Sequence, residues 1–235
     1  SSHRLTVQLM VNGIKAIPIA LDDYFVNRDR TPIGEDGKPD FESIHSLDLD
    51  LFNEHMLALI NGEEVALPSF SFETGEISFN EKIKIDNKTP IIIEGIHALN
   101  PALLKDIDDK LKYKIYIAPM TTLNIDDYSK VSTTDTRMLR RIVRDNKTRG
   151  FGARETLRMW PDIKAGEREN IFRFQDDVDT VVNSSLIYEI GVLKTYVEPL
   201  LFNVEEEDPE YPEALRLINF LRNFLPHSPL IKSPS

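Results

Sequence analysis

The sequence contains no cysteine among its 235 residues. This absence excludes a disulfide framework, cysteine-ligated zinc and a cysteine nucleophile, and it suits a cytoplasmic protein. No apolar run approaches the ~20 residues that a membrane-spanning helix needs, so we expect no membrane partner. Positive charge is also scarce. The 28 Lys and Arg residues against 39 Asp and Glu give a net charge of −11, which argues against a nucleic-acid partner.

The cationic residues that do occur are concentrated in Thr133–Gly150, TTDTRMLRRIVRDNKTRG. At roughly 100° per residue, the spacing predicts a helix with one apolar and one cationic face. The apolar face would carry Met138, Leu139, Ile142 and Val143. The cationic face would carry Arg137, Arg140, Arg141 and Arg144, with Arg149 just beyond. The N-cap side chain would come from Thr133, Thr134 or Asp135, and Gly150 would end the helix.

A row of guanidinium groups on an acidic chain favours a dense anion such as a polyphosphate. The alternative is a solvated helix whose arginines pair with carboxylates of the protein itself. For one arginine that alternative is the better interpretation, whereas four on one face favour phosphate.

Acidic residues follow two of the short apolar segments that we predict to be strands. Ile17–Leu21 ends in Asp22 and Asp23, and Ile91–Ile96 contains Glu94. In a parallel sheet these strand ends share one rim, where α/β proteins bind ligands. Two carboxylates opposite a cationic row suit phosphoryl transfer, with Mg²⁺ bridging the phosphates. Taken singly the signals are weak, since an aspartate could merely cap a helix and Glu94 could be a buried ion-pair partner.

The remaining pattern predicts an α/β fold with a mainly parallel sheet. Lys114–Ala118 and Asp179–Asn183 are further strand candidates, and Pro68–Ile85 reads as a small β region with a turn at Thr74–Gly75. Ile187–Tyr196 fits either a strand or a helix. Helices are expected at His3–Asn12, Ser46–Asn61, Pro101–Leu111, Ala153–Trp160, Ile163–Phe174 and Pro212–Leu225, with a break at Trp160–Pro161.

Three stretches carry a resemblance to a known family: IALDDYF at 19–25, IIIEGIHAL at 91–99 and STTDTRMLRRIVRD at 132–145. They resemble the uridine kinase and phosphoribulokinase family of P-loop kinases, and bacterial uridine kinase-like proteins in particular. The resemblance implies a P-loop kinase-like three-layer fold with a small β-hairpin insertion and an arginine-rich lid around 133–175. It also implies a catalytic domain over 1–202, followed at 203–235 by a C-terminal helix and a loose tail.

The resemblance further implies ATP and Mg²⁺ as cofactors and a nucleoside or similar small hydroxyl compound as acceptor. Asp22 matches the general base, and Glu94 matches the acidic residue near Mg²⁺, with Asp22 as a second metal ligand. The acceptor site would involve Tyr24, Phe41, Glu42, Phe70, Ile96 and Arg141. The arginines of the lid and ATP phosphates would be Arg137, Arg140, Arg144 and Arg149, of which Arg137 could equally be structural.

The sequence departs from the family pattern in two places. The phosphate-binding loop Gly-x-x-x-x-Gly-Lys-Ser/Thr does not occur among the ten glycines. We expect that native residues upstream of Ser1 carry it, and the rival explanation is a kinase-like protein that has lost ATP binding. The Tyr and His with which uridine kinases read the pyrimidine are Phe70 and Gly75 here, which puts uridine itself in doubt.

Two hypotheses therefore remain beside each other. The first is an ATP-dependent small-molecule kinase. The second is a non-catalytic module that binds a nucleotide or a phosphorylated metabolite. RNA binding through the arginine helix is a third and weaker hypothesis, because the total charge is acidic. The sequence leaves the oligomeric state open, a homo-oligomer included.

Overall fold

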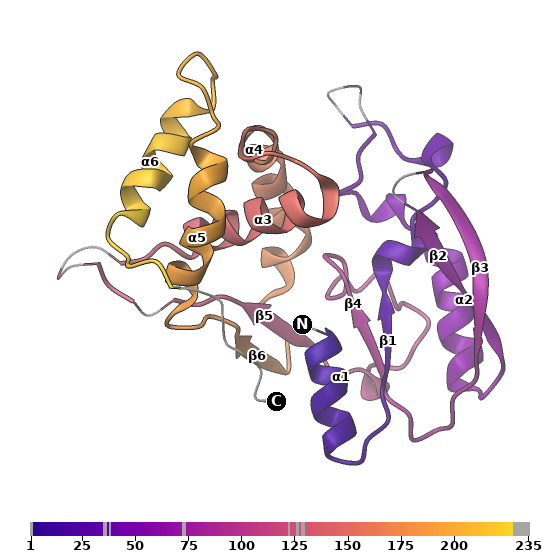
Figure 1. Cartoon of the computed structure of the whole chain (residues 1–235). Coiled ribbons are helices and arrows are strands. Elements are labelled where there is room, and N and C mark those ends of the chain that lie inside the picture. Colours follow the sequence, from indigo (N-terminus) through magenta and orange to yellow (C-terminus); the bar gives the residue numbers. More distant parts are fainter. Residues whose placement is uncertain are drawn as a thin grey trace. The chain divides into compact units, whose positions relative to one another are not determined.

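The computed structural model of the chain describes residues 2–34, 37, 39–71, 74–121, 123–125, 127 and 130–227. The chain folds into two compact units (Figure 1). The first unit comprises Ser1–Lys114 and Gly166–Asp179, and the second comprises Ile115–Ala165 and Thr180–Ser235. Each unit has a hydrophobic core of its own.

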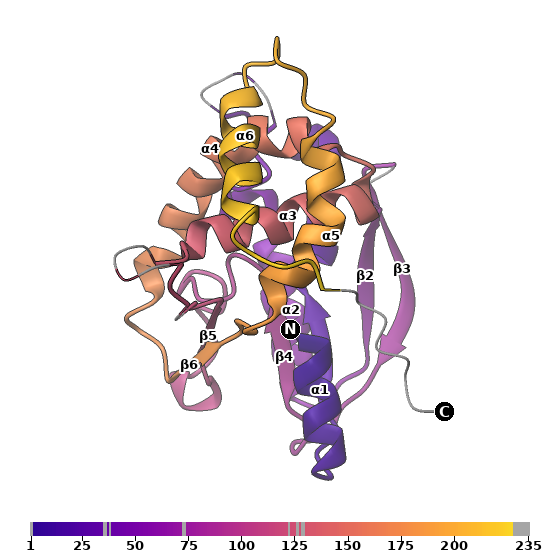
Figure 2. The same cartoon turned by 60° about the vertical axis from the view of Figure 1, so that its left-hand side comes forward.

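The first unit combines a parallel strand pair with an antiparallel hairpin and two helices. Its elements are α1 (Ser2–Val11), β1 (Ile17–Ala20), α2 (Leu49–Ile60), β2 (Val65–Ser71), β3 (Glu76–Ile83) and β4 (Ile91–Glu94). Strands β1 and β4 run parallel, with Ala20 opposite Glu94. Strands β2 and β3 form the hairpin, which is long and separate from that pair in both views (Figures 1 and 2).

Local chemistry fixes several boundaries in this unit. The carboxylate of Asp48 accepts a hydrogen bond from the Leu51 N–H at 3.1 Å and caps α2, so the helix begins three residues later than predicted. The hairpin register shifts between Leu67 and Pro68, because proline has no N–H to give to the ladder. Gly75 turns the hairpin with φ of 75°, as the sequence indicated.

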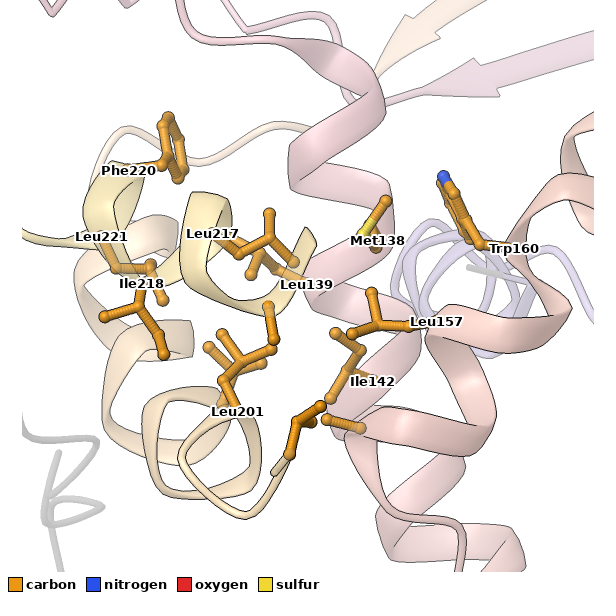
Figure 3. Packing of buried hydrophobic residues seen from close by; sticks show 14 of the residues in the cluster. Met138, Leu139, Ile142, Leu157, Trp160, Leu201, Leu217, Ile218, Phe220 and Leu221 are labelled. Atoms are coloured by element: carbon orange, nitrogen blue, oxygen red, sulfur yellow. The ribbon is translucent and has the colours of Figure 1, made fainter. Parts of the chain in front are cut away.

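The second unit is a helical bundle beside a short parallel strand pair. Its elements are β5 (Ile115–Ala118), α3 (Thr133–Arg149), α4 (Ala153–Asn170), β6 (Thr180–Asn183), α5 (Glu189–Leu201) and α6 (Tyr211–Leu221). Helix α4 belongs to this unit as far as Ala165, and its last residues belong to the first unit. Helices α3, α5 and α6 lie side by side (Figure 2). The apolar face of α3 carries Leu139 and Ile142, which are fully buried and pack among Leu201 and Leu217 (Figure 3).

The prediction of an α/β fold with mainly parallel pairing is confirmed, because two of the three strand pairs are parallel. The predicted arginine helix is also confirmed, including its end at Gly150, whose φ is 69°. Its N-cap is Ser132, one residue before the predicted candidates, and the Ser132 hydroxyl accepts from the Asp135 N–H. The ambiguous segment 187–196 is the start of helix α5. In the described part of the chain, no helix is long and apolar enough to span a membrane.

Two predicted elements are wrong. Pro101–Leu111 is not an α-helix, since only a short 3₁₀ turn at Asp109–Leu111 forms there among other turns. The expected break at Trp160–Pro161 is absent, and α4 runs through Pro161 without interruption. The isoleucines of β4 are half-buried rather than covered on both faces, and β4 pairs with one strand only within the described residues.

Candidate functional site

Two carboxylates follow the carboxyl ends of the paired strands β1 and β4. Asp22 lies in the 3₁₀ turn Leu21–Tyr24, which directly continues β1, and Glu94 is the last residue of β4. Both side chains belong to exposed residues. Parallel pairing of β1 with β4 therefore brings the two predicted functional carboxylates to the same sheet edge.

Gly95 explains how the chain leaves this edge. A Cβ atom at position 95 would lie 2.7 Å from the Cβ of Leu21, and Gly95 adopts a φ of 153°. Only glycine allows the backbone after Glu94 to pass so close to the residue before Asp22. Gly95 thus allows the backbone next to Glu94 to lie close to the backbone next to Asp22.

Asp23, next to the predicted base, is tied to the hairpin instead. Its carboxylate accepts a hydrogen bond from the Phe70 N–H at 3.4 Å. Burial raises the pKa of Asp23, and this hydrogen bond opposes the increase. Asp23 thereby links the turn after β1 to strand β2.

Tyr24 lies in the core of the first unit rather than at a surface. Its ring packs edge-on against Phe52 with 4.9 Å between centroids, and its hydroxyl lies 3.0 Å from Nδ1 of His55. Burial, followed by the charge of Asp23, raises the pKa of Tyr24. Because only 1% of Tyr24 is exposed, we leave it out of the acceptor site that we propose below.

Three phenylalanines form a continuous aromatic wall. The ring of Phe25 lies 6.1 Å from that of Phe41 and 5.6 Å from that of Phe70. Phe25 and Phe70 are buried, whereas Phe41 is 38% exposed. The structure thus joins the two predicted acceptor-site aromatics through Phe25, which sequence reasoning missed. Its position three residues after Asp22 was the available signal.

Glu42 is held between its own loop and the last turn of α4. The Asp40 carboxylate accepts from the Glu42 N–H at 2.9 Å, and the Glu42 carbonyl accepts from the Asn170 side-chain amide at 3.0 Å. A Cβ atom at Gly166 would lie 3.1 Å from Oε2 of Glu42, so the carboxylate packs directly over that glycine. Asn170 and Gly166 thus position a residue that the family resemblance places in the acceptor site.

The two residues after Gly95 differ in exposure. Ile96 is 37% exposed, which is compatible with its predicted place in an acceptor pocket. His97 is 3% exposed, and burial lowers its pKa. The lowered pKa favours a neutral imidazole at His97.

Within the second unit, a buried carboxylate gathers three arginines of the predicted phosphate site. Oδ2 of Asp145 lies 2.9 Å from Nε of Arg141, and Oδ1 lies 3.5 Å from both Arg144 Nε and Arg149 Nη1. The Asp145 side chain is completely buried. Burial lowers the pKa of Arg144, and the charge of Arg141 adds to this effect. Three positive charges and one negative charge leave this Asp145 cluster with a net charge of +2.

Arg140, also predicted to bind phosphate, points to a different set of partners. Its guanidinium pairs with both carboxylate oxygens of Glu189, one of them at 2.8 Å, and donates to the Ser184 carbonyl at 2.7 Å. Arg140 is therefore committed to the first turn of α5 and to the segment before it. Arg137 is half-buried and already engaged. Of the predicted phosphate ligands, Arg141, Arg144 and Arg149 thus belong to the Asp145 cluster, whereas Arg140 is an anchor on α5.

The donor set fits a magnesium ion held largely by phosphate oxygens. Within the described residues, no group of three or more His, Cys, Asp or Glu side chains could hold a metal alone. Mg²⁺ normally takes one or two carboxylates together with water and substrate phosphates. Asp22 and Glu94 supply that number of carboxylates at one sheet edge.

The architecture places the chain in a structural class. A crystal structure of a protein assigned as a fructose transport system kinase, from Silicibacter sp. TM1040, matches with a TM-score of 0.50 at 16% identity. The match covers 77% of this chain and 81% of that one. At this identity the likeness shows the fold alone, which is of the α/β class.

Sequence relatives narrow the assignment. The model of the phosphoribulokinase / uridine kinase family matches residues 13–185, so the chain belongs to that family. A uridine kinase of Staphylococcus haemolyticus is 29% identical over 161 residues, covering 68% of this chain and 70% of the relative. One of Macrococcus caseolyticus is 30% identical over 140 residues, covering 60% of each chain. One of Bacillus pumilus is 29% identical over 138 residues, covering 59% of this chain and 58% of the relative.

Proposed function

We propose that the protein catalyses ATP-dependent phosphoryl transfer to a hydroxyl of a small molecule, with a nucleoside-type acceptor. The observation that carries the proposal is the pairing of β1 with β4, which puts Asp22 and Glu94 at one sheet edge. Family membership and relatives named as uridine kinases support it. A cytoplasmic location and the absence of nucleic-acid and membrane partners remain predictions.

In this proposal the residues of the first unit serve the acceptor. Asp22 accepts the proton of the attacking hydroxyl. The aromatic wall of Phe25, Phe41 and Phe70 offers the exposed edge of Phe41 to a planar group, while Glu42 accepts hydrogen bonds from sugar hydroxyls. Ile96 completes the apolar side of the pocket. With its hydroxyl turned to His55, Tyr24 takes no part.

The arginines of α3 and the two carboxylates that follow β1 and β4 serve the phosphates and their metal ion. When bound, ATP with Mg²⁺ supplies the phosphoryl group and the neutralising cation. Glu94 and Asp22 provide carboxylate oxygens for that cation. Arg141, Arg144 and Arg149 are gathered on Asp145 and stabilise negative charge on the phosphates, with Arg141 on the acceptor side. Arg140 acts as an anchor for α3 rather than a phosphate ligand.

The substitution Asp22→Asn tests the assignment of the base. We expect the rate of phosphoryl transfer from ATP to fall by about 10² to 10⁴, the usual contribution of a positioned general base. The measurement is kcat in a nucleoside panel with ATP and Mg²⁺. Asp29→Asn is the matched control, because Asp29 is exposed and lies outside the turn after β1. A kinase activity that persists at the wild-type rate in Asp22→Asn would show that the base is another group.

A non-catalytic module that binds a nucleotide or a phosphorylated metabolite is the second candidate, because the net charge of +2 on the Asp145 cluster suits a phosphate group whether or not it is transferred. Calorimetric titration with ATP and Mg²⁺ separates the two functions. Binding of ATP without turnover of any acceptor would favour the module, whereas turnover that is lost in Asp22→Asn would favour the kinase.

A further inference from the structure

Helix α6 lies beyond the family match at 13–185, yet it is ion-paired with the arginine helix α3. Nη1 and Nη2 of Arg216 donate to Oδ2 and Oδ1 of Asp135 at 3.0 and 2.7 Å. This is a two-pronged guanidinium–carboxylate pair, the geometry that fixes orientation as well as distance. Asp135 is a buried residue in the first turn of α3.

A second pair holds the same helix from α5. Arg140 bonds both oxygens of Glu189 in the first turn of α5, and it also donates to the Ser184 hydroxyl at 3.2 Å and to the Ser184 carbonyl at 2.7 Å. Asp135 and Arg140 are five residues apart, so their side chains leave α3 in different directions. Two polar anchors in different directions oppose rotation of α3 about its axis.

The apolar face of α3 adds little of this restraint by itself. Leu139 and Ile142 pack among Leu217 and Leu201 (Figure 3), and such contacts tolerate small rotations of a helix because they have no direction. A bidentate ion pair does not tolerate such a rotation, because its donors and acceptors must stay aligned. The orientation of the Asp145 cluster therefore depends on Asp135 and Arg140.

We infer that Arg216 is a positioning residue for the phosphate-binding arginines: from α6 it holds Asp135 and thereby sets the orientation of Arg141, Arg144 and Arg149. The inference rests on the proposed function, because it assigns a purpose to the orientation of that cluster. It also gives α6 a part in polyphosphate binding although the family match ends before it.

The surroundings of Arg216 show why its removal would disturb α3. Arg216 also donates to Glu213 on its own helix at 2.7 and 2.8 Å. Hydrogen bonds to Glu213 and Asp135 raise the pKa of Arg216, which therefore stays charged. Without the guanidinium, the buried carboxylate of Asp135 would lose its cation and face Glu213, a like charge.

The experiment compares Arg216→Ala, Arg216→Lys and Arg222→Ala in the whole protein. Arg222 is the matched control, because its guanidinium donates to Asn219 of the same helix and not to α3. Two quantities are measured: the Kd of inorganic tripolyphosphate by calorimetry, and hydrogen exchange of the amides of 133–149 by mass spectrometry. Urea unfolding establishes that each variant is folded.

We expect tripolyphosphate binding to weaken about 5-fold in Arg216→Ala, in the range of couplings between contacting residues. Exchange in 133–149 should become faster. Arg216→Lys should recover part of both effects, since lysine keeps the charge but not the fork, and Arg222→Ala should match the wild type. In an Asp135→Asn background, Arg216→Ala should add no further loss of affinity.

The inference is overturned if Arg216→Ala binds tripolyphosphate as the wild type does, or if its effect persists undiminished in the Asp135→Asn background. It is also overturned if Arg222→Ala has an equal effect, because the contact with α3 would then be irrelevant. A wild-type protein that does not bind tripolyphosphate would instead contradict the proposed phosphate site. The exchange data would then still report whether Arg216 orders α3.

Discussion

Asp145 is the residue on which the charge distribution of α3 depends. It is fully buried, and its two oxygens hold Arg141, Arg144 and Arg149 from three positions along the helix and its end. A buried carboxylate without cations would be strongly unfavourable, and the arginines without it would repel one another. Asp145 therefore contributes both to stability and to the arrangement of the proposed phosphate site.

Asp145→Asn should lower the free energy of unfolding by about 1 to 3 kcal/mol. Removing one member of a buried ion pair costs ~3–5 kcal/mol, and we reduce that figure because the side chains of Arg144 and Arg149 are 56% and 41% exposed. Urea denaturation gives the value. Asp162→Asn, at an exposed position of α4, should change it by less than ~0.5 kcal/mol. Equal effects of the two substitutions would refute the central role of Asp145.

The Tyr24–His55 pair makes stability depend on pH. The Tyr24 hydroxyl lies 3.0 Å from Nδ1 of His55, which places the imidazole against the buried ring of Tyr24. Burial lowers the pKa of His55, although the charges of Glu54 and Asp48 oppose this effect. The unfolded chain takes up its proton near pH ~6.5, and the folded chain does so at lower pH.

The melting temperature should therefore decrease as the pH falls below about 6.5, and it should be level with respect to this group above that value. His97, whose pKa burial also lowers, contributes in the same direction. Thermal denaturation followed over a pH series measures the effect. His55→Gln should reduce the slope on the acidic side, whereas His45→Gln, at an exposed position, should leave it intact. A slope unchanged by His55→Gln would exclude His55 as its source.

At the scale of elements, helix α4 continues through a proline although proline usually interrupts a helix. Pro161 lies inside the helix, where proline removes the N–H that would bond the carbonyl of Leu157. Trp160 and Ile163, on either side of it, are buried in the core of the second unit. Burial of both side chains outweighs the lost hydrogen bond, so the helix continues.

Pro161→Ala should therefore raise the free energy of unfolding, by about 1 to 3 kcal/mol, because it restores that hydrogen bond and removes the clash. Urea denaturation is again the measurement. Pro212→Ala is the matched control, since proline in the first turn of a helix loses no intrahelical hydrogen bond. A destabilised Pro161→Ala protein would mean that the proline is required for the path of α4.

These elements also show what the sequence can and cannot predict. The arginine helix was predictable because its apolar residues recur at helical spacing and Gly150 ends it. The helix expected at Pro101–Leu111 fails because local side chains capture its backbone. Asn100 accepts from the Ala102 N–H and Asp108 from the Lys110 N–H, which replaces helical hydrogen bonds with turns.

The site was predictable to the extent that motifs lie at strand ends. Asp22 and Glu94 could be found in that way, because their strands are short and apolar. Asn170 and the central role of Asp145 could not be found from the sequence. The role of Asn170 depends on a contact with Glu42, far away in sequence, and that of Asp145 depends on the rotamers of three arginines. Sequence spacing placed Arg140 beside Arg141, but their partners lie on different elements.

At the scale of the whole molecule, the two cores should unfold as separate cooperative units. Phe52 and its neighbours lie wholly in the first unit, and Leu139 and its neighbours lie wholly in the second. We expect a calorimetric enthalpy of unfolding that exceeds the van't Hoff enthalpy. Asp145→Asn should shift only the transition of the second unit. A single transition with equal enthalpies would show that the cores unfold together.

The chain passes between its two units three times, and this affects how recombination between related genes can exchange a whole unit. The polypeptide passes from one unit to the other after Lys114, after Ala165 and after Asp179. A single crossover between the gene for this protein and that of a relative would therefore mix ancestry inside at least one unit, since a crossover after Lys114 already separates 166–179 from the rest of the first unit. Exchange of an intact second unit requires three junctions at once, one of them inside α4. Chimeras designed with all three junctions should therefore keep the contacts of 166–179 with the first unit, such as Asn170 with Glu42, which chimeras with the single junction after Lys114 take from two parents.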